Sequence, residues 1–458
     1  MSLHIVILAA GQGKRMHSST PKVLHSVAGK AMLEWVVDAA LHLKPEVIHV
    51  VIGFGGEIIL KALPDLPVKW VFQAEQLGTG HAVLQALVDI PATSQVLVMS
   101  ADVPLIKVST LKGLVDLSRS ADKSPLCLLT AKVVSPVGLG RILRNKKQEV
   151  LAIIEEKDAS SVEREINEIY SGICSTKASH LLHWLPKLTC QNAQGEYYLT
   201  EIIGMAVEEG VLIETLLVED EMEIQGVNNR VQLQTLEREC QHRTATALML
   251  SGVTLLDASR IDIRGELSCG KDVTIDINNV FKGNVEIGDG TTIGSHCEFT
   301  NVIVGKNCEI LSHSVLSDCQ IGDNCQIGPF ARLRPGTVLG TDCKIGNFVE
   351  TKNAVFDSHS KASHLSYLGD VTIGKEVNIG AGTITCNYDG VFKHQTVIED
   401  GVFVGSDTQL VAPVTIGKGA TIAAGSTISK DAPAGELTLT EAKQKTIFGW
   451  IRPKKRDK

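Results

Sequence analysis

The sequence predicts two different folds in tandem, an α/β domain with a mostly parallel sheet and then a parallel β-helix. Residues 1–230 alternate short apolar runs with amphipathic stretches, which is typical of α/β domains. From residue 252 onward, aliphatic residues recur six positions apart in several runs, a period that marks a hexapeptide β-helix. Between them, residues 231–251 carry apolar side chains at helical spacing and predict one connecting helix. The predicted domains are therefore 1–230 and 252–458, joined by a helical linker.

The α/β domain is expected to build its sheet from short buried strands. The strands are expected at residues 5–8, 47–52, 69–73 and 96–100, and the helices at residues 32–43, 80–88 and 109–117. The first strand begins almost at once, without the basic and long apolar segments of a leader, so no signal peptide is expected. No stretch reaches about 18 uninterrupted apolar residues, so no transmembrane helix is expected.

The six-residue period runs without a slip over residues 398–428. The aliphatic positions there are Ile398, Val404, Leu410, Ile416, Ile422 and Ile428. Each is expected to point inward and to stack on its equivalent in the next coil. A glycine often follows, as in Ile287-Gly288 and Ile321-Gly322, and is expected to turn the corner at positive φ. The period breaks at about 353–371 and 385–397, where inserted loops that carry function are expected.

Composition and charge exclude several classes of protein. A net charge of -8 argues against a general nucleic-acid binder but is compatible with a phosphorylated small substrate. The eleven cysteines form no CxxC pair, which supports neither a zinc site nor a disulfide framework and favours the cytoplasm. Four of them follow a repeat aliphatic by four residues and are expected to pack in the core: Cys297, Cys308, Cys325 and Cys343. The basic tail, residues 454–458, is expected to be a solvated terminus.

A glycine-containing turn after the first strand is the first candidate site. Backbone N–H groups at Gly11 and Gly13 can approach phosphate oxygens, and Arg15 and Lys22 supply positive charge. A single such turn is as often structural as functional. Asp102 ends another strand, where a carboxylate is well placed to hold Mg²⁺ or, more simply, to cap a turn.

Further motifs follow in order: Gly78-Thr-Gly80, Gly138-Leu-Gly-Arg141, Glu155-Glu156 and Gly226-Val-Asn-Asn229. Together they resemble the sugar-1-phosphate nucleotidyltransferases. With the hexapeptide half included, the whole chain resembles the family of bacterial bifunctional N-acetylglucosamine-1-phosphate uridylyltransferases and glucosamine-1-phosphate N-acetyltransferases. That resemblance implies a Rossmann-like nucleotidyltransferase domain, a left-handed parallel β-helix and a homotrimer with acetyl sites at subunit boundaries. It implies no nucleic-acid or membrane partner.

The resemblance implies two reactions, which together make UDP-N-acetylglucosamine for cell-wall and lipopolysaccharide precursors. Glucosamine 1-phosphate is first acetylated by acetyl-CoA, and the product then reacts with UTP and releases pyrophosphate, with Mg²⁺ as cofactor. By resemblance, Arg15 and Lys22 neutralise the triphosphate, and Asp102 and Asn228 hold the metal. The other residues implied to bind the substrates of uridylyl transfer are Leu8, Ala9, Ala10, Gly11, Gln73, Gly78, Thr79, Ser100, Ala101, Gly140 and Glu155.

The acetyl site is implied on the β-helix. His364 is the expected base, although a histidine alone in a loop is more often structural. Glu350 is either its orienting partner or a solvated repeat residue. The phosphate is expected to be held by Arg334, Lys352 and Tyr367, the sugar by Asn378, Asn387 and Tyr388, and the pantetheine by Ala381, Ser406 and Ala424.

Several positions depart from the family pattern, among them Ser100-Ala101 in place of a usual Tyr-Gly and Lys14 in place of a common Thr. Tyr170 stands where an asparagine usually contacts the sugar, so that contact is not expected here. Glu441 stands where an arginine usually meets coenzyme A phosphate, and Lys443 or Lys445 is the candidate substitute. Two other readings stay open: a single-activity nucleotidyltransferase with a non-catalytic β-helix, and a non-catalytic binding scaffold.

Overall fold

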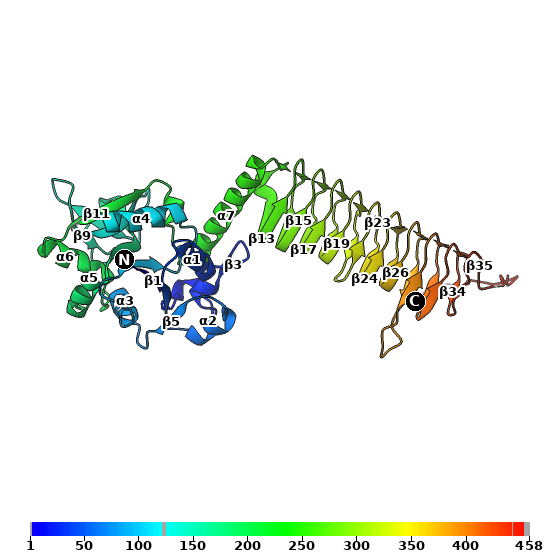
Figure 1. Cartoon of the computed structure of the whole chain (residues 1–458), viewed down its shortest axis with the longest axis horizontal. Helices are drawn as coiled ribbons and strands as arrows, with labels where there is room; N and C mark the ends of the chain where they lie inside the picture. Colours follow the sequence, from blue (N-terminus) through cyan, green and yellow to red (C-terminus); the bar gives the residue numbers. More distant parts are fainter. Residues whose placement is uncertain (1, 121–124, 442, 453–458) are drawn as a thin grey trace, which may run out of the picture. The chain divides into compact units, whose positions relative to one another are not determined.

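The computed structural model describes residues 2–120, 125–441 and 443–452 (Figure 1). The chain divides into two compact units, Met1–Gln241 and His242–Lys458. The division falls inside one long helix, α7 (Arg230–Leu250), which confirms the helix predicted over 231–251. The predicted basic tail, 454–458, lies outside the described residues. Within the described residues, no helix is long and apolar enough to cross a membrane.

The first unit is an α/β fold. Its strands are β1 (Leu3–Leu8), β2 (Ser26–Val27), β3 (Lys30–Ala31), β4 (Val47–Ile52), β5 (Lys69–Phe72), β6 (Gln95–Ser100), β7 (Leu126–Lys132), β8 (Gly140–Arg144), β9 (Val150–Ile154), β10 (Glu168–Lys177) and β11 (Ile213–Val218). Its helices are α1 (Met32–Leu41), α2 (Gly56–Ala62), α3 (Thr79–Leu87), α4 (Val108–Ser120), α5 (Ala178–Trp184) and α6 (Ile202–Glu208), followed by α7. The strands and helices predicted up to residue 117 are confirmed as β1, β4, β5, β6, α1, α3 and α4.

The main sheet has the order β11-β7-β10-β6-β1-β4-β5. The strands β6, β1, β4 and β5 pair in parallel, and β10 runs antiparallel to both of its neighbours. Both faces of the sheet are covered, since Ile5 and Ile7 belong to one hydrophobic cluster and Val6 to another. This explains why β1 is apolar at nearly every position. The carboxyl ends of β1 and β6 meet at one edge of the sheet, which is where α/β folds bind ligands.

The second unit is a parallel β-helix. Its strands are β12 (Thr254–Leu255), β13 (Ile261–Cys269), β14 (Thr274–Ile275), β15 (Asn279–Ile287), β16 (Thr292–Ile293), β17 (Glu298–Val304), β18 (Glu309–Ile310), β19 (Val315–Ile321), β20 (Gln326–Ile327), β21 (Arg332–Leu333), β22 (Val338–Leu339), β23 (Lys344–Asn347), β24 (Glu350–Phe356), β25 (Lys361–His364), β26 (Tyr367–Ile373), β27 (Asn378–Ile379), β28 (Ile384–Cys386), β29 (Thr396–Ile398), β30 (Phe403–Val404), β31 (Gln409–Val411), β32 (Val414–Ile416), β33 (Thr421–Ile422), β34 (Thr427–Ile428) and β35 (Leu437–Thr438). They form two long parallel sheets.

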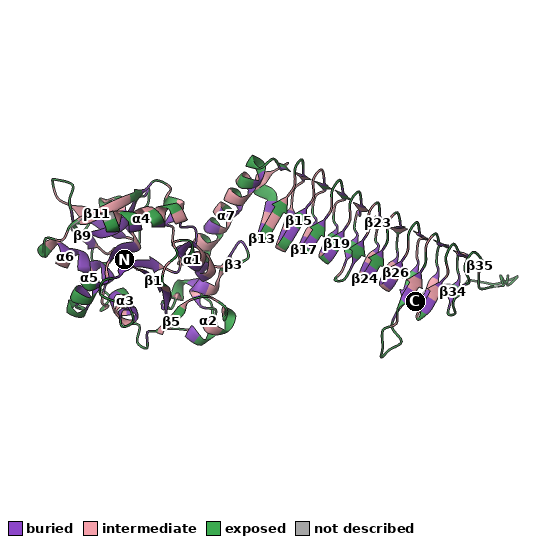
Figure 2. Ribbon diagram, in the orientation of Figure 1, coloured by how far each residue is buried: buried purple, intermediate pink, exposed green. Residues whose placement is uncertain are grey.

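The aliphatic positions of the repeat face inward, as predicted. Val304 pairs with Ile287 in one coil and with Ile321 in the next, and all three are buried. Figure 2 shows buried and exposed residues alternating along the strands of this unit. Burial of each such side chain is worth roughly 1.5–3 kcal/mol, so a continuous stack holds the coils together. The four repeat cysteines are also buried in this core, as predicted.

The glycines after the inward aliphatics do not have the predicted positive φ. Among the described residues, Gly288 and Gly346 are absent from the left-handed set, whereas Asn307, His313 and Phe348 belong to it. A Cβ on Gly288 would lie 2.6 Å from the carbonyl carbon of Gly305, and one on Gly346 would lie 1.9 Å from the Ser363 oxygen. These glycines are therefore required by close approach of neighbouring coils, and other residue types turn the corners.

One predicted interruption is wrong and the other is right. Residues 353–371 form regular coils, with Phe356 in register with Ile373, 17 residues later. Several coils contain 17 residues instead of 18, so the six-residue period shifts by one position without any insertion. The next coil is longer, since Ile373 is in register with Ile398. Its extra residues form a loop between β28 and β29, closed by a bridge between Tyr388 and Lys393.

Candidate active sites

A cavity of about 600 Å³ lies at the carboxyl ends of β1 and β6. Most of the residues predicted to bind UTP line it: Leu8, Ala9, Ala10, Gly11, Arg15, Lys22, Gln73, Gly78, Thr79, Ser100 and Asp102. The lining residues that the sequence prediction missed include Gln76, Gln194 and Glu196. The last two come from a loop far along the chain, and no local motif marks them.

The backbone explains how this wall is held. The amide of Ala9 donates to the Val51 carbonyl at 2.8 Å, and the Ala101 amide donates to the Leu8 carbonyl at 3.1 Å. Gly13 has φ +61, and a Cβ there would lie 2.8 Å from the Lys22 Cβ. The turn that carries Arg15 can therefore fold back over Lys22 only with glycine at position 13.

On the opposite wall of the cavity, the loop that contains Glu196 and Tyr197 leaves no room for a side chain at Gly78. Gly78 has φ +119, and a Cβ there would lie 2.6 Å from the Tyr197 carbonyl oxygen. The Tyr197 carbonyl accepts from the Gly80 amide at 2.8 Å. This pairing brings Gln194 and Glu196 to the cavity and holds the start of α3.

Lys22 and Asp102 form an ion pair in the cavity, and both side chains are largely buried. The Ser100 hydroxyl donates to Asp102 Oδ1 at 2.6 Å, and Lys22 Nζ lies 3.5 Å from Asn228 Oδ1. Burial alone would raise the pKa of Asp102, but Lys22 and Ser100 outweigh burial and hold that pKa below its usual range. Asp102 is therefore an anion, although it is nearly excluded from water.

Four predicted residues are not among those that line this cavity: Ala101, Gly140, Glu155 and Asn228. Ala101 is fully buried under it. Gly140 and Glu155 lie together beside the β8–β9 hairpin, where a Cβ on Gly140 would be 3.7 Å from either Glu155 oxygen. Burial raises the pKa of Glu155, opposed by a hydrogen bond from the Thr200 hydroxyl at 3.1 Å. Tyr170 pairs with Gly140 across the strands and is packed in the hydrophobic core.

On the β-helix, His364 ends β25 and is exposed. It does not lie in an inserted loop, which corrects the prediction. Its Nδ1 lies 3.0 Å from Asn347 Oδ1 in the preceding coil. Because the amide oxygen only accepts, this bond puts the hydrogen on Nδ1 and leaves the lone pair on Nε2. Asn347 was missed by the sequence prediction, since only the coil register brings it beside His364.

The predicted coenzyme A residues follow His364 along one column. Ala362, Ile379, Val404 and Ile422 are in register from coil to coil. His364, Ala381, Ser406 and Ala424 each lie two residues further on and so occupy equivalent places in successive coils. A Cβ on Gly405 would lie 2.4 Å from the Ala424 amide, which shows how closely these coils approach.

The residues predicted to bind the phosphate lie along the other long sheet. Arg334 Nη1 bonds Glu350 Oε1 at 2.8 Å, so Glu350 pairs with Arg334 and not with His364. Lys352 has its pKa lowered, first by the adjacent Lys393 and then by Arg334. Lys393 lies in the inserted loop and was missed by the sequence prediction. The three cationic side chains therefore lie near one another, and their like charges repel.

The remaining predicted sugar residues are divided between the sheets. Asn387 donates to Asp370 Oδ2 at 2.5 Å, and the exposed Tyr388 donates to the Gly390 carbonyl at 2.5 Å. Tyr367 opens β26, and its hydroxyl lies over Gly369, where a Cβ would be only 2.4 Å away. Asn378, in contrast, belongs to β27 in the other long sheet. Asn387 follows β28, which belongs to the same long sheet as β26.

The departures in the C-terminal segment are all exposed. Glu441, Lys443 and Lys445 lie beyond the last strand of the β-helix. No hydrogen bond or ion pair of the described residues fixes their side chains. Their roles at a coenzyme A phosphate stay predictions.

Comparison with known proteins agrees with both folds. Residues 5–169 match the MobA-like NTP transferase domain, 263–367 match the GMPPB C-terminal domain and 395–430 match the bacterial transferase hexapeptide (six repeats). The chain is thus a nucleotidyltransferase fused to a hexapeptide-repeat acyltransferase.

Relatives over the full length define the family. The chain is 61% identical to the bifunctional protein GlmU of Legionella pneumophila (strain Lens), over 100% of both chains. It is 54% identical to that of Marinobacter nauticus, over 99% of both, and 52% identical to that of Nitrosospira multiformis, over 100% of this chain and 99% of the relative. The chain belongs to the GlmU family of bifunctional enzymes.

Proposed function

We propose that the two units divide the synthesis of UDP-N-acetylglucosamine. Residues 1–230 would join N-acetylglucosamine 1-phosphate to UTP, and residues 252–458 would acetylate glucosamine 1-phosphate, with 231–251 as linker. The observation that carries the first assignment is the Lys22–Asp102 ion pair inside a glycine-walled cavity, with Asn228 Oδ1 3.5 Å from Lys22 Nζ. It combines cations for a triphosphate with buried oxygen ligands, and it offers no nucleophile.

Uridylyl transfer then proceeds by direct displacement. A phosphate oxygen of the sugar 1-phosphate bonds to the α-phosphorus of UTP, while the bond from that phosphorus to the pyrophosphate oxygen breaks. Lys22 and Arg15 neutralise the phosphates, and the Gly11 turn presents backbone amides to them. Gln73 and Gly78-Thr79 face the base. Gly140 and Glu155 bind the amino sugar at the β8–β9 hairpin.

The oxygen ligands fit a divalent cation. Asp102 and Asn228 both direct side-chain oxygens toward Lys22 Nζ, so one positive charge already lies between them. Carboxylate and amide oxygens are the ligands that Mg²⁺ prefers. Asp102 and Asn228 would hold that ion, which would supply charge neutralisation at the phosphates when bound.

Acetyl transfer is proposed at His364. Its Nε2 takes a proton from the amine of glucosamine 1-phosphate as nitrogen bonds to the thioester carbon, and the carbon–sulfur bond breaks to release coenzyme A thiol. Asn347 keeps the required tautomer. Arg334, Lys352 and Tyr367 hold the phosphate, and Ala381, Ser406 and Ala424 leave room for the pantetheine arm.

The acetyl site is proposed to be shared between copies of the chain. Asn378 lies in β27 of one long sheet, whereas Asn387 follows β28 of the other, and a neighbouring copy would complete the sugar site. A homotrimer with parallel β-helices would place one sheet against another at each boundary. We place the enzyme in the cytoplasm, where eleven free thiols stay reduced.

The test is to give the purified enzyme glucosamine 1-phosphate, acetyl-CoA, UTP and Mg²⁺ and to follow free thiol and pyrophosphate together. Thiol should appear first, and pyrophosphate should follow with a lag. Pyrophosphate without thiol, after N-acetylglucosamine 1-phosphate is supplied, would instead indicate a single-activity nucleotidyltransferase. Sedimentation at working concentration tests the trimer.

A further inference from the structure

The most deeply buried cation of the described first unit is Arg141, which the two reactions do not use. Its side chain is only 1% exposed. Arg141 is the second residue of β8, and its backbone pairs with Ile154 of β9 and with Ile169 of β10. An arginine so buried is unusual unless its charge is matched.

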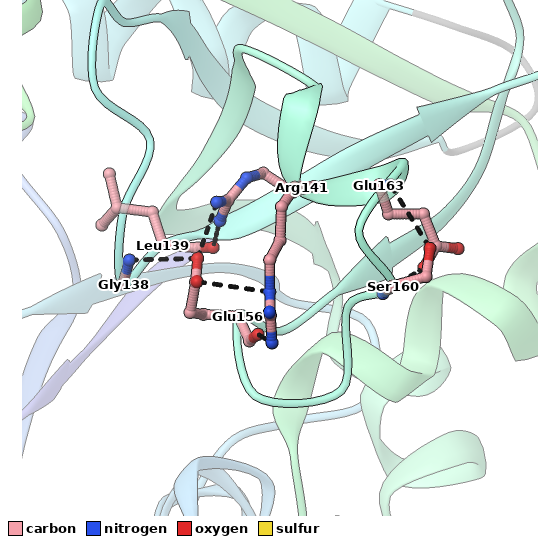
Figure 3. Close-up of polar contacts among 7 residues, drawn as sticks. Gly138, Leu139, Arg141, Glu156, Ser160 and Glu163 are labelled. Carbon is pink, nitrogen blue, oxygen red and sulfur yellow. Dashed lines mark hydrogen bonds and ion pairs between the residues drawn. The ribbon is translucent and has the colours of Figure 1, made fainter.

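Arg141 is matched by Glu156, and the two side chains point at each other (Figure 3). Arg141 Nη2 lies 2.6 Å from Glu156 Oε2, and Arg141 Nη1 donates to the Leu139 carbonyl. The Arg141 bond lowers the pKa of Glu156, so the pair is ionic at neutral pH. One guanidinium fork therefore ties the turn before β8 to the segment after β9.

Glu156 also contacts the turn before β8 directly. Its Oε2 also accepts from the Gly138 amide at 3.2 Å, and Gly138 has φ +82 at the turn. Arg164 reaches Glu156 from the solvent side, with its Nε 3.6 Å from Oε1, but Arg164 is half exposed. Glu156 is thus a junction of three contacts, of which the one with Arg141 is desolvated.

These contacts flank both residues assigned to the amino sugar. Gly140 lies between Leu139 and Arg141, and Glu155 precedes Glu156. Glu155 itself bonds Thr200 and not Arg141, so adjacent carboxylates serve different partners. A shift of the Arg141–Glu156 pair would move the Gly140 backbone and the Glu155 carboxylate together. A displacement near 1 Å can cost about 100-fold when it misplaces a reacting group.

We propose that Arg141 and Glu156 are positioning residues for the amino sugar of uridylyl transfer. Neither is a catalytic residue, because each contacts the protein and acts through Gly140 and Glu155. Their role rests on the proposed function, since only that function assigns the sugar to Gly140 and Glu155. The pair fixes the distance between the Gly140 backbone and the Glu155 carboxylate. That distance would decide which sugar fits between them.

The experiment compares Arg141→Lys and Glu156→Gln with wild type in the full chain. Lysine keeps the charge but loses the bidentate fork, and glutamine keeps the shape but loses the charge. Because burial puts the folding of the lysine variant at risk, the partly exposed Glu156 provides the second variant. Arg164→Ala is the matched control, since it removes only solvent-side contacts of Glu156, namely the ion pair with its carboxylate and a hydrogen bond to its backbone carbonyl.

The expected result is specific to one substrate. KM for N-acetylglucosamine 1-phosphate should rise roughly tenfold in Arg141→Lys and about threefold in Glu156→Gln. KM for UTP and the rate of thiol release from acetyl-CoA should stay within about twofold of wild type, as should every parameter of Arg164→Ala. The unchanged acetyl reaction also reports the concentration of chain with a folded second unit, and the melting temperature of the first unit reports its own folding.

Two results would overturn the proposal. Equal losses for both substrates, with a lower melting temperature of the first unit, would reduce the pair to a structural ion pair. Unchanged sugar KM in both variants would show that the hairpin holds its shape without it. The proposed function fails if wild type releases pyrophosphate from UTP only with another sugar 1-phosphate. In that case the variants should still show a raised KM for that other sugar 1-phosphate.

Discussion

Lys22 and Asp102 form an ion pair inside the cavity of the first unit, with 14% of each side chain exposed. The two residues are 80 positions apart and come from different elements. Asp102 follows β6, whose end is fixed by pairing with β1, and Lys22 follows the turn folded over by Gly13. The cavity thus holds its own cation beside the carboxylate assigned to the metal.

Removing Lys22 should make the first unit depend on a divalent cation. In Lys22→Ala, Asp102 would stay buried without its partner, which should cost up to about 3 kcal/mol of unfolding free energy. Mg²⁺ should then raise the melting temperature of Lys22→Ala more than that of wild type, because binding to the folded state stabilises it. Uridylyl transfer should fall by at least about 100-fold.

Thermal melts with and without Mg²⁺ check this prediction. Asp102→Asn is the control, since it removes the charge that the cation would meet, and its melting temperature should not respond to Mg²⁺. Equal Mg²⁺ shifts in wild type and all variants would contradict the assignment of Asp102 to the metal.

Buried histidines should make the first unit less stable in mild acid. His4 Nδ1 and His49 Nε2 lie 3.2 Å apart in the sheet, and both residues are almost fully buried. Burial, and next the charge of His4, lower the pKa of His49 to about 4. The pKa of His4 is also lowered by burial. The charge of Glu46 partly offsets the lowering of the pKa of His4. At His49, Lys69 lowers the pKa further and Asp89 raises it.

The sign follows from these directions. Between pH 6.5 and 4 the unfolded chain binds protons at His49 that the folded chain does not, so stability is full above 6.5 and falls below it. The loss from His49 should approach about 3 kcal/mol at pH 4. Three of the four tryptophans, Trp35, Trp70 and Trp184, lie in this unit, so fluorescence-detected urea unfolding measures it. A urea midpoint of His49→Gln that falls with acid as steeply as that of wild type would exclude this cause.

Asn347 should set the pH profile of acetyl transfer through His364. Asn347→Ala should lower kcat of thiol release about tenfold, because the tautomer with a free Nε2 is no longer favoured. Asn347→Asp should move the acidic limb of kcat/KM to higher pH, since a carboxylate beside the ring favours the imidazolium. Pyrophosphate release should be unchanged in both. A profile that does not move in Asn347→Asp would remove this role.

Gly346 should tolerate no side chain. A Cβ there would lie 1.9 Å from the Ser363 carbonyl oxygen, one position before Asn347, so Gly346→Ala must separate two coils. We expect several kcal/mol of destabilisation and loss of thiol release. In Gly419→Ala, by contrast, the added Cβ has open space and only the positive φ counts against it, about 1–2 kcal/mol. Circular dichroism melts of the two variants should differ accordingly, and similar melts would contradict the close approach.

Sequence patterns predicted the features that depend on residues close together in the chain. The period of six identified the inward side chains, and the turn at Gly11 and the strand end at Asp102 identified the first cavity, because each depends on residues near in sequence. Pairs set by register were not predictable in this way. Asn347 beside His364 and Lys393 beside Lys352 depend on how many residues each coil contains. Coils of 17 residues also mimicked an insertion at 353–371, where there is none.

The glycine prediction failed for an instructive reason. The pattern correctly marked glycine after the inward aliphatics, but it could not tell a conformational requirement from a spatial one. Gly288 and Gly346 are needed because neighbouring backbones leave no room for a Cβ. Glu350 shows the same limit, since its partner Arg334 lies in the preceding coil and not beside it in sequence.

The most direct measurement follows thiol and pyrophosphate in His364→Ala and Lys22→Ala, each supplied with both sets of substrates. We expect His364→Ala to lose thiol release yet to release pyrophosphate from UTP and N-acetylglucosamine 1-phosphate at the wild-type rate. Lys22→Ala should do the reverse. A mixture of the two variants should restore the full sequence of reactions. Loss of both products in either folded variant, or thiol release undiminished in His364→Ala, would contradict two separate sites on this chain.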